Sequence, residues 1–347
     1  MDGWSAGVNH VFMATSADST KTLVLTRSDV IALLPMADCI AAVEAAFAQD
    51  AAGRAIPAGV LGTHVSDGGF HMKTAGLLGR PSYFAAKINA NFPANPGRSG
   101  LPTIQGVLVL FDATNGAPLA IMDSAEITRL RTAAASAVAA KHLALDGASS
   151  LTVCGCGLQA RAHLEAFRVV RPVDRVFAYD LDAKRAHAFA EDVRHLLDID
   201  VSVVPSIRAG SIQSAMIVTC TPSQTPVLGL DDVAPGAFVA AVGADSEHKQ
   251  EIDVGLMAAA VVVVDVLRQC ATIGDLHHAL EAGVMTESGV RADLASVVAG
   301  TVVGRKNDRE IVVFDSTGTA LEDVAAAAIV YGRAMANGAG VQIDLSR

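Results

Sequence analysis

The residues best suited to chemistry form a glycine-rich turn, Leu151-Thr-Val-Cys-Gly155-Cys-Gly157-Leu-Gln-Ala160. This G-x-G-x-x-A spacing follows an apolar run and precedes a segment with apolar residues at helical intervals. Small residues are needed because Gly155 makes a tight turn, Gly157 lets the backbone approach a pyrophosphate, and Ala160 permits close helix–strand packing. The phosphates would bind exposed N–H groups at the helix N-terminus. The turn therefore predicts a dinucleotide site.

An acidic residue, Asp180, stands 20 residues past Ala160 at the end of the next predicted strand. A carboxylate there accepts hydrogen bonds from the ribose hydroxyls and repels a 2′-phosphate, which favours NAD, with NADP still possible because Lys184 and Arg185 are near. The predicted cofactor contacts are Gly155, Gly157, Leu158, Gln159, Ala160, Asp180 and Thr221. Cys154 and Cys156 have C-x-C spacing with no second ligand pair, so we predict no metal site.

A second group of residues could bind and protonate a small carboxylate. Asp245 follows the apolar run 238–242, and ligands meet parallel strands at their carboxyl ends. It could equally be a helix cap or a solvated loop residue. Lys73, Lys87 and Arg131 would ordinarily be solvated surface charges. In an acidic chain, however, basic residues within apolar segments suit a carboxylate pocket.

Two kinds of pattern predict the elements that position these residues. Between residues 23 and 123 we expect a helix over 28–52 with a break at Pro35, and an antiparallel sheet from 82–89, 106–111 and 118–122, with a hairpin turn at Asn115-Gly116. After an Ala-rich helix (124–145), short apolar strands alternate with helices at 151–154, 176–179, 201–204, 216–220, 238–242 and 261–264, which is typical of a parallel sheet. A last helix spans 319–336.

These elements predict an α/β protein with a Rossmann-type parallel sheet domain and a mixed α+β domain for substrate binding and dimerisation, completed by the C-terminal helix. We expect the parallel-sheet domain at 131–316 and the mixed domain at 23–130 and 317–347. Residues 1–22 lack the features of a signal peptide, so we expect a poorly ordered extension there.

Composition limits the possible functions. The 347 residues are 51% apolar, and the formal net charge is −10 with no long basic run, which argues against nucleic-acid binding. Five cysteines scattered through apolar segments are typical of reduced thiols. The longest apolar runs are too short to span a bilayer. We therefore expect a cytoplasmic protein that binds neither nucleic acid nor membrane.

The ordered motifs resemble the ornithine cyclodeaminase/mu-crystallin family. The matching segments are 70–77, 87–95, 100–106, 128–135, 243–251 and 314–323. The resemblance implies a homodimer, with Lys87 contacting substrate, Arg131 binding its carboxylate, Asp245 as the catalytic aspartate and Thr103 near the cofactor or substrate. Two features differ: no arginine follows Pro57, and His71 stands where cyclodeaminases have a glutamate. The segment from Phe70 resembles the imine-reducing branch, in which Lys73 would supply the missing cation.

We therefore expect an NAD(P)H-dependent reductase of cyclic or linear imino acids, such as Δ1-pyrroline-2-carboxylate. In that reaction Asp245 and Lys87 would be catalytic, and Arg131, Lys73, His71 and Thr103 would bind substrate. One alternative is an ornithine cyclodeaminase, which would release ammonia without net use of NADH. Another is an amino acid dehydrogenase of the alanine dehydrogenase type. The third alternative is a non-enzymatic, dinucleotide-dependent binding protein similar to mu-crystallin.

Overall fold

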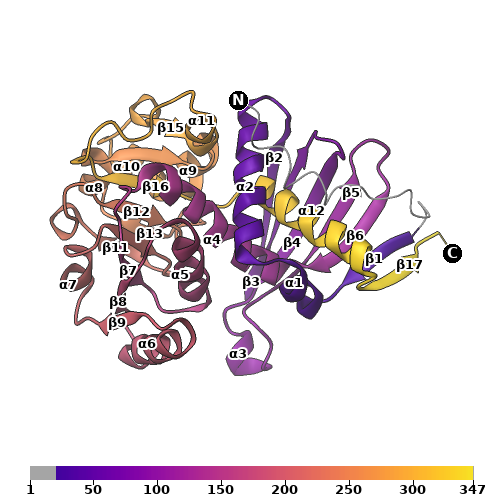
Figure 1. The fold of residues 1–347 in the computed structure, drawn as a ribbon, viewed down its shortest axis with the longest axis horizontal. Helices are drawn as coiled ribbons and strands as arrows, with labels where there is room; N and C mark the ends of the chain where they lie inside the picture. The colour runs from indigo at the N-terminus through magenta and orange to yellow at the C-terminus, as the bar shows by residue number, and fades with distance from the viewer. Residues whose placement is uncertain (1–20, 347) are drawn as a thin grey trace. The chain divides into compact units, whose positions relative to one another are not determined.

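A computed structural model describes residues 21–346, and the chain divides into two units (Figure 1). The first unit contains the chain up to Arg131 together with the residues from Thr319 onward, and the second spans Thr132–Gly318. The expected boundary after residue 22 is wrong. Lys21 and Thr22 already belong to strand β1 (Lys21–Leu25), which pairs with β17 (Val341–Asp344) near the C-terminus. Residues 1–20 lie outside the described part of the chain.

The first unit is built on a seven-stranded sheet in the order β17-β1-β6-β5-β4-β3-β2. Its other strands are β2 (Ala55–Val65), β3 (Gly68–Leu77), β4 (Tyr83–Asn91), β5 (Ile104–Asp112) and β6 (Pro118–Asp123). The predicted hairpin is present, with Gly116 at φ 79° between β5 and β6. The three predicted strands β4, β5 and β6 pair antiparallel, as expected, and β1 adds a parallel pairing with β6. Strands β2 and β3 were not predicted, since glycine and proline interrupt their alternation.

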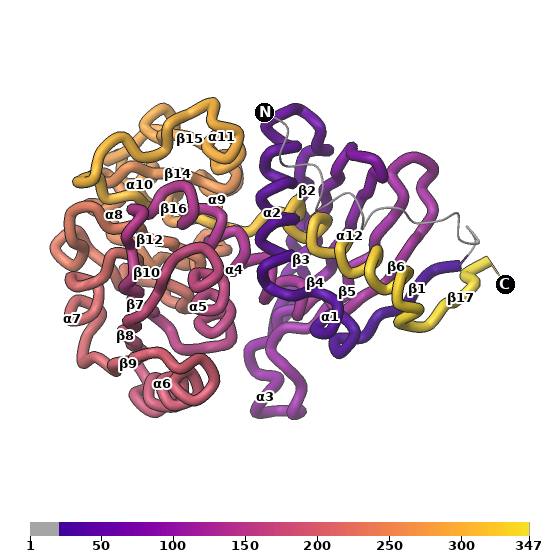
Figure 2. Tube along the Cα trace, viewed as in Figure 1, coloured from indigo at the N-terminus to yellow at the C-terminus, as the bar shows by residue number. Residues whose placement is uncertain are grey.

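Helices cover one face of this sheet. The predicted break at Pro35 separates α1 (Arg27–Leu33) from α2 (Met36–Ala51). Helix α12 (Ala320–Asn337) begins with a capping box between Thr319 and Glu322, and ends at Gly338 with φ 68°. Figures 1 and 2 show α12 beside α2 on the sheet, and its many alanines allow this close packing. The short α3 (Asn95–Arg98) lies between β4 and β5.

No single helix within residues 21–346 is long and apolar enough to cross a membrane; α1 and α2 together meet the length and composition criteria, but they are bent by 84°.

The second unit contains an eight-stranded sheet in the order β15-β14-β16-β12-β10-β7-β8-β9, with every pairing parallel. This confirms the Rossmann-type fold. The strands are β7 (Ser150–Cys154), β8 (Arg175–Tyr179), β9 (Asp200–Val203), β10 (Met216–Thr219), β12 (Phe238–Ala241), β14 (Val261–Val264), β15 (Ala292–Asp293) and β16 (Val312–Asp315). The four-residue β16 was not predicted, yet it lies between β12 and β14.

Helices bury both faces of the parallel sheet, which explains its unbroken apolar strands. Val239 belongs to a core cluster with residues of three helices, α8 (Val254–Ala259), α9 (Leu267–Ile273) and α10 (Asp275–Glu281). The preceding residue, Phe238, points to the opposite face and contacts Phe167 of the helix that follows the glycine turn, at 6.3 Å between ring centroids. Helix α4 (Ser124–Leu143) begins in the first unit and ends in the second. The remaining α-helices of the second unit are α5 (Leu158–Val170), α6 (Ala183–Leu197), α7 (Ile207–Ser211) and α11 (Leu294–Val298), and a small sheet joins β11 (Gln224–Leu228) to β13 (Gln250–Ile252).

Candidate active site

The glycine turn joins β7 to α5. Gly155 has φ +91°, a conformation that L side chains rarely adopt, and a β-carbon there would lie 3.0 Å from the Cys220 oxygen and from Thr221 Cγ2. Gly157 immediately precedes α5, and a β-carbon on it would meet nothing within 4 Å. The backbone is therefore closely packed at Gly155 and open at Gly157, beside the N-terminus of a 13-residue helix.

Asp180 follows β8 and lies against this turn. Its two carboxylate oxygens accept the backbone N–H groups of Cys156 and Asp182, both at 2.9 Å. Within the described residues, the buried side-chain oxygen of Gln159 has no hydrogen-bond partner. A positively polarised helix end, an open glycine backbone and a carboxylate at the end of the second strand fit a dinucleotide. These residues come together as the sequence predicts.

Glu251 on β13 holds together two of the loops beside this turn. It is fully buried, and its carboxylate accepts four hydrogen bonds: from Thr219 Oγ1, from the N–H and Oγ1 of Thr221, and from the Gly243 N–H, at 2.6 to 2.7 Å. Burial raises the pKa of Glu251, whereas these four donors oppose the rise. Because all four partners donate, the ionised carboxylate suits the site. We did not predict this role, although a lone acid in a short strand is a signal for it.

Asp245 lies two residues beyond Gly243. A β-carbon on Gly243 would lie 2.2 Å from the Thr221 oxygen, so glycine is needed where the two loops touch. The Asp245 side chain is 57% exposed, and its Oδ1 lies 2.6 Å from Lys249 Nζ. Asp245 therefore offers an accessible carboxylate on a loop that Glu251 anchors.

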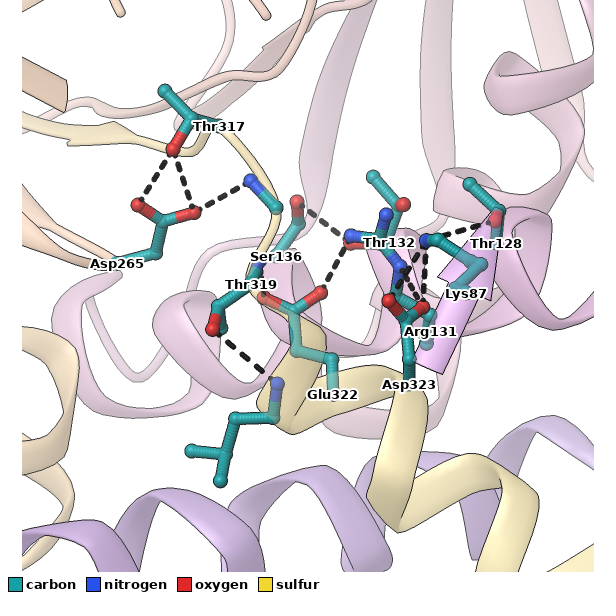
Figure 3. Close-up of polar contacts among 12 residues, drawn as sticks. Lys87, Thr128, Arg131, Thr132, Ser136, Asp265, Thr317, Thr319, Glu322 and Asp323 are labelled. Carbon is teal, nitrogen blue, oxygen red and sulfur yellow. Dashed lines mark hydrogen bonds and ion pairs between the residues drawn. The ribbon is translucent and has the colours of Figure 1, made fainter. Parts of the chain in front are cut away.

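The first unit contains a buried cluster of opposite charges, which we call the Lys87 cluster: Lys87, Arg131, Glu322 and Asp323. Figure 3 shows the two basic side chains pointing toward the two carboxylates. Lys87 Nζ lies 2.8 Å from Asp323 and 3.2 Å from Thr128 Oγ1. Arg131 contacts Glu322 at 2.7 Å and Asp323 at 3.0 Å. All four residues are at most 5% exposed, so each charge is compensated by a partner.

Burial is the main cause of an unusual pKa in this cluster. Burial and, to a smaller extent, the neighbouring Arg131 together lower the pKa of Lys87 to about 7, while Asp323 opposes the change. The pKa of Asp323 is itself lowered, because the attraction of Lys87 and Arg131 outweighs its burial. An amine that titrates near neutral pH inside the protein is a candidate for proton handling.

The other predicted substrate residues lie on β3 or next to β5. Lys73 on β3 pairs directly with Lys87 on β4, and His71 pairs with Asn89 in the same ladder. All four therefore share one face of the sheet. Thr103 lies just before β5, where its carbonyl accepts the Phe92 N–H at 2.8 Å.

Sequence reasoning missed Glu322 and Asp323 as site residues, although it noted the segment that contains them. Arg129, two residues from Arg131, instead pairs with Glu126 at 2.6 Å. The two arginines therefore have different partners, as their helical spacing implies.

Comparison with known proteins identifies the family to which this chain belongs. The sequence profile of the ornithine cyclodeaminase/mu-crystallin family matches residues 20–338. An alanine dehydrogenase of Archaeoglobus fulgidus is 38% identical over 329 residues, covering 94% of this chain and 99% of the relative. An archaeal alanine dehydrogenase dimer with bound NAD superposes with a TM-score of 0.89 at 38% identity, covering 94% and 99% of the two chains.

A similar structure is the Thermococcus litoralis Δ1-pyrroline-2-carboxylate reductase in complex with NADH and L-proline. It has a TM-score of 0.88 and 32% identity, with coverage of 93% of this chain and 100% of that one. The profile match and these similarities extend over both units of the fold. The protein is a member of the ornithine cyclodeaminase/mu-crystallin family.

Proposed function

We propose that the protein is an NAD-dependent enzyme that reduces an α-imino acid to the corresponding amino acid. The turn from Gly155 to Ala160 would hold the pyrophosphate, and Asp180 would accept the ribose hydroxyls. When bound, NADH supplies the hydride. The open backbone at Gly157 supports this cofactor assignment, as do the NAD and NADH in the two similar structures.

The Lys87 cluster is the observation that best supports an α-imino acid as the substrate. Lys87 and Arg131 are buried basic side chains that share the carboxylate of Asp323, and Lys73 is the cross-strand neighbour of Lys87. A substrate carboxylate is the ligand that such a group of basic side chains would bind. A charge-assisted contact with Lys87 or Arg131 would also orient the substrate.

Asp245 is our candidate for the group that keeps the imine nitrogen protonated. A protonated imine is much more electrophilic, and such acid–base assistance is typically worth about 10²–10⁴ in rate. The exposed carboxylate of Asp245, paired with Lys249, is available for this role. Asp245→Asn should therefore lower turnover while NADH still binds, and wild-type turnover with an unchanged pH profile would contradict the role.

The first substrate to test is a cyclic imino acid such as Δ1-pyrroline-2-carboxylate. The second is the linear imine of pyruvate and ammonia, which the 38% identity to an alanine dehydrogenase favours. An ornithine cyclodeaminase must also bind a second ammonium group. The two acids of the Lys87 cluster are already paired with Lys87 and Arg131, so this reaction is less well supported.

The deciding experiment measures NADH oxidation by the purified protein with each imino acid and, separately, with pyruvate and ammonia. Parallel assays with NADPH test the cofactor preference. Ammonia and proline formed from ornithine without NADH consumption would indicate a cyclodeaminase instead. If no imino or keto acid oxidises NADH while the dinucleotide still binds, a binding protein is the better description.

We further propose that two copies of the chain associate through the face of the seven-stranded sheet opposite α2 and α12. Leu61, Met72, Ile88 and Val107 are paired in register across β2 to β5 and are 37 to 57% exposed. Such a contiguous apolar row is unusual on the surface of a monomer. The similar archaeal structure is a dimer. Ile88→Asp should yield a monomer by light scattering, and an unchanged mass would contradict this interface.

A further inference from the structure

We propose that His277, His278 and Glu281 bind one divalent transition-metal ion, for which Zn²⁺ is the best candidate. All three lie on α10, away in sequence from the residues assigned to cofactor and substrate. One ring nitrogen of each histidine and one oxygen of Glu281 lie within 4.8 Å of one another. His277 and Glu281 are four residues apart, so they share a helix face, with 3.8 Å between His277 Nε2 and Glu281 Oε2.

The protein also selects the tautomer of each histidine. His277 Nδ1 lies 3.3 Å from the Ala271 carbonyl, and His278 Nε2 lies 2.9 Å from the Lys249 carbonyl. A carbonyl oxygen only accepts, so these two ring nitrogens must carry the hydrogens. In a neutral ring the other nitrogen, Nε2 of His277 or Nδ1 of His278, then presents a lone pair.

This arrangement is the usual environment of a metal-bound histidine. Such residues almost always donate their second N–H to a carbonyl, a carboxylate or water, which fixes the ring and makes the ligating nitrogen more basic. Here both histidines have carbonyl acceptors in different segments, one before α10 and the other next to β13. This second observation separates the group from a chance cluster of polar side chains.

The ligand types favour zinc, and the side chains must move closer to bind it, because their ligand atoms are only known to lie within 4.8 Å of one another. Zinc–ligand bonds of about 2.0–2.1 Å in a tetrahedron place neighbouring ligand atoms about 3.3 Å apart. The pair at 3.8 Å needs only a small rotation, and the Glu281 side chain is 74% exposed and therefore able to move. Two imidazoles and one carboxylate suit Zn²⁺ or a similar ion, whereas Mg²⁺ and Ca²⁺ prefer oxygen ligands alone. Water would complete the coordination.

Calorimetric titration of the metal-free full-length protein with ZnCl₂ tests the proposal. We expect one Zn²⁺ per protomer, with a Kd of about 1–10 µM. His277→Ala and Glu281→Gln should each weaken binding at least about tenfold. Because Glu281 is largely exposed, its variant should fold even if the histidine variant does not, and circular dichroism checks both.

The matched control is His187→Ala on α6. His187 and Glu191 have the same four-residue spacing on an exposed helix face, but a second adjacent histidine is missing from the sequence. This variant should bind Zn²⁺ as tightly as the wild type. The proposal is overturned if the wild type does not bind Zn²⁺, or if both α10 variants bind it unchanged, which would assign the ion to the cysteines or another site. The result does not depend on the proposed imino acid reduction.

Discussion

Replacing Asp323 with asparagine would probe the proposed role of Lys87 most directly. The change keeps the size of the side chain but removes a negative charge 2.8 Å from Lys87 Nζ and 3.0 Å from Arg131 Nε. At an effective dielectric constant of about 20, unit charges 2.8 Å apart attract by about 6 kcal/mol. That corresponds to about 4 pKa units, an upper limit because water and side chains rearrange.

The sign of the effect follows from the causes of the pKa. Asp323 raises the pKa of Lys87, which burial and Arg131 lower to about 7. Without Asp323 the pKa falls further, so Lys87 becomes neutral at pH 7. If the protonated amine binds the substrate carboxylate, wild-type kcat/KM should decline as the pH rises through about 7. In Asp323→Asn this decline should move to lower pH by at least about one unit.

Stability should change with the same variant. Breaking a buried ion pair typically costs about 3–5 kcal/mol, measurable as a lower urea midpoint. In the wild type the folded pKa of Lys87 (about 7) lies below its ordinary value of 10.5. The unfolded chain therefore binds more protons between these pH values, so the contribution of Lys87 to stability rises from pH 7 to about 10.5. Lys87→Met should remove this rise.

Glu322→Gln is the matched control, because Glu322 is equally buried and contacts Arg131. It should lower stability but leave the pH of the decline in kcat/KM unchanged. If folded Asp323→Asn keeps the wild-type pH profile, Lys87 is not the group that titrates and the reasoning is refuted.

Three further predictions concern the second unit. Glu251→Gln places an amide opposite buried donors, so it should lower the free energy of unfolding by about 1–3 kcal/mol. It should also raise the Kd for NADH about tenfold in a fluorescence titration, and an unchanged Kd would show that the two loops do not depend on Glu251. Gly155→Ala forces a side chain into a backbone conformation with positive φ, so urea unfolding should show a free energy of unfolding at least about 1–2 kcal/mol lower, together with weaker NADH binding. Wild-type values of both would exclude a steric role for Gly155. Asp180→Ser removes the negative charge that would repel a 2′-phosphate, so kcat/KM for NADPH relative to that for NADH should rise about tenfold. A constant ratio would mean that Asp180 does not set the preference for NADH over NADPH.

The cofactor half of the candidate site is largely readable from the sequence. Gly155, Gly157 and Ala160 are close neighbours in the chain, and the strand and helix around them are local patterns. Asp180 follows in the next strand, so a single βαβ unit brings these residues together. The hairpin at Gly116 and the break at Pro35 are equally local. Strands β2 and β3 were missed because tertiary pairing overrides their weak propensity.

By itself the sequence therefore determined the glycine turn, the acid that follows it and the alternation of strands and helices, because each depends on a short stretch of chain. Only the tertiary structure decided the partners of Lys87 and Arg131, since Asp323 lies 236 residues from Lys87. It also decided that Glu251 binds Thr221 and Gly243. The physical reason is burial: the loss of water makes these long-range ionic and hydrogen-bonded contacts necessary and lowers the pKa of Lys87 to about 7.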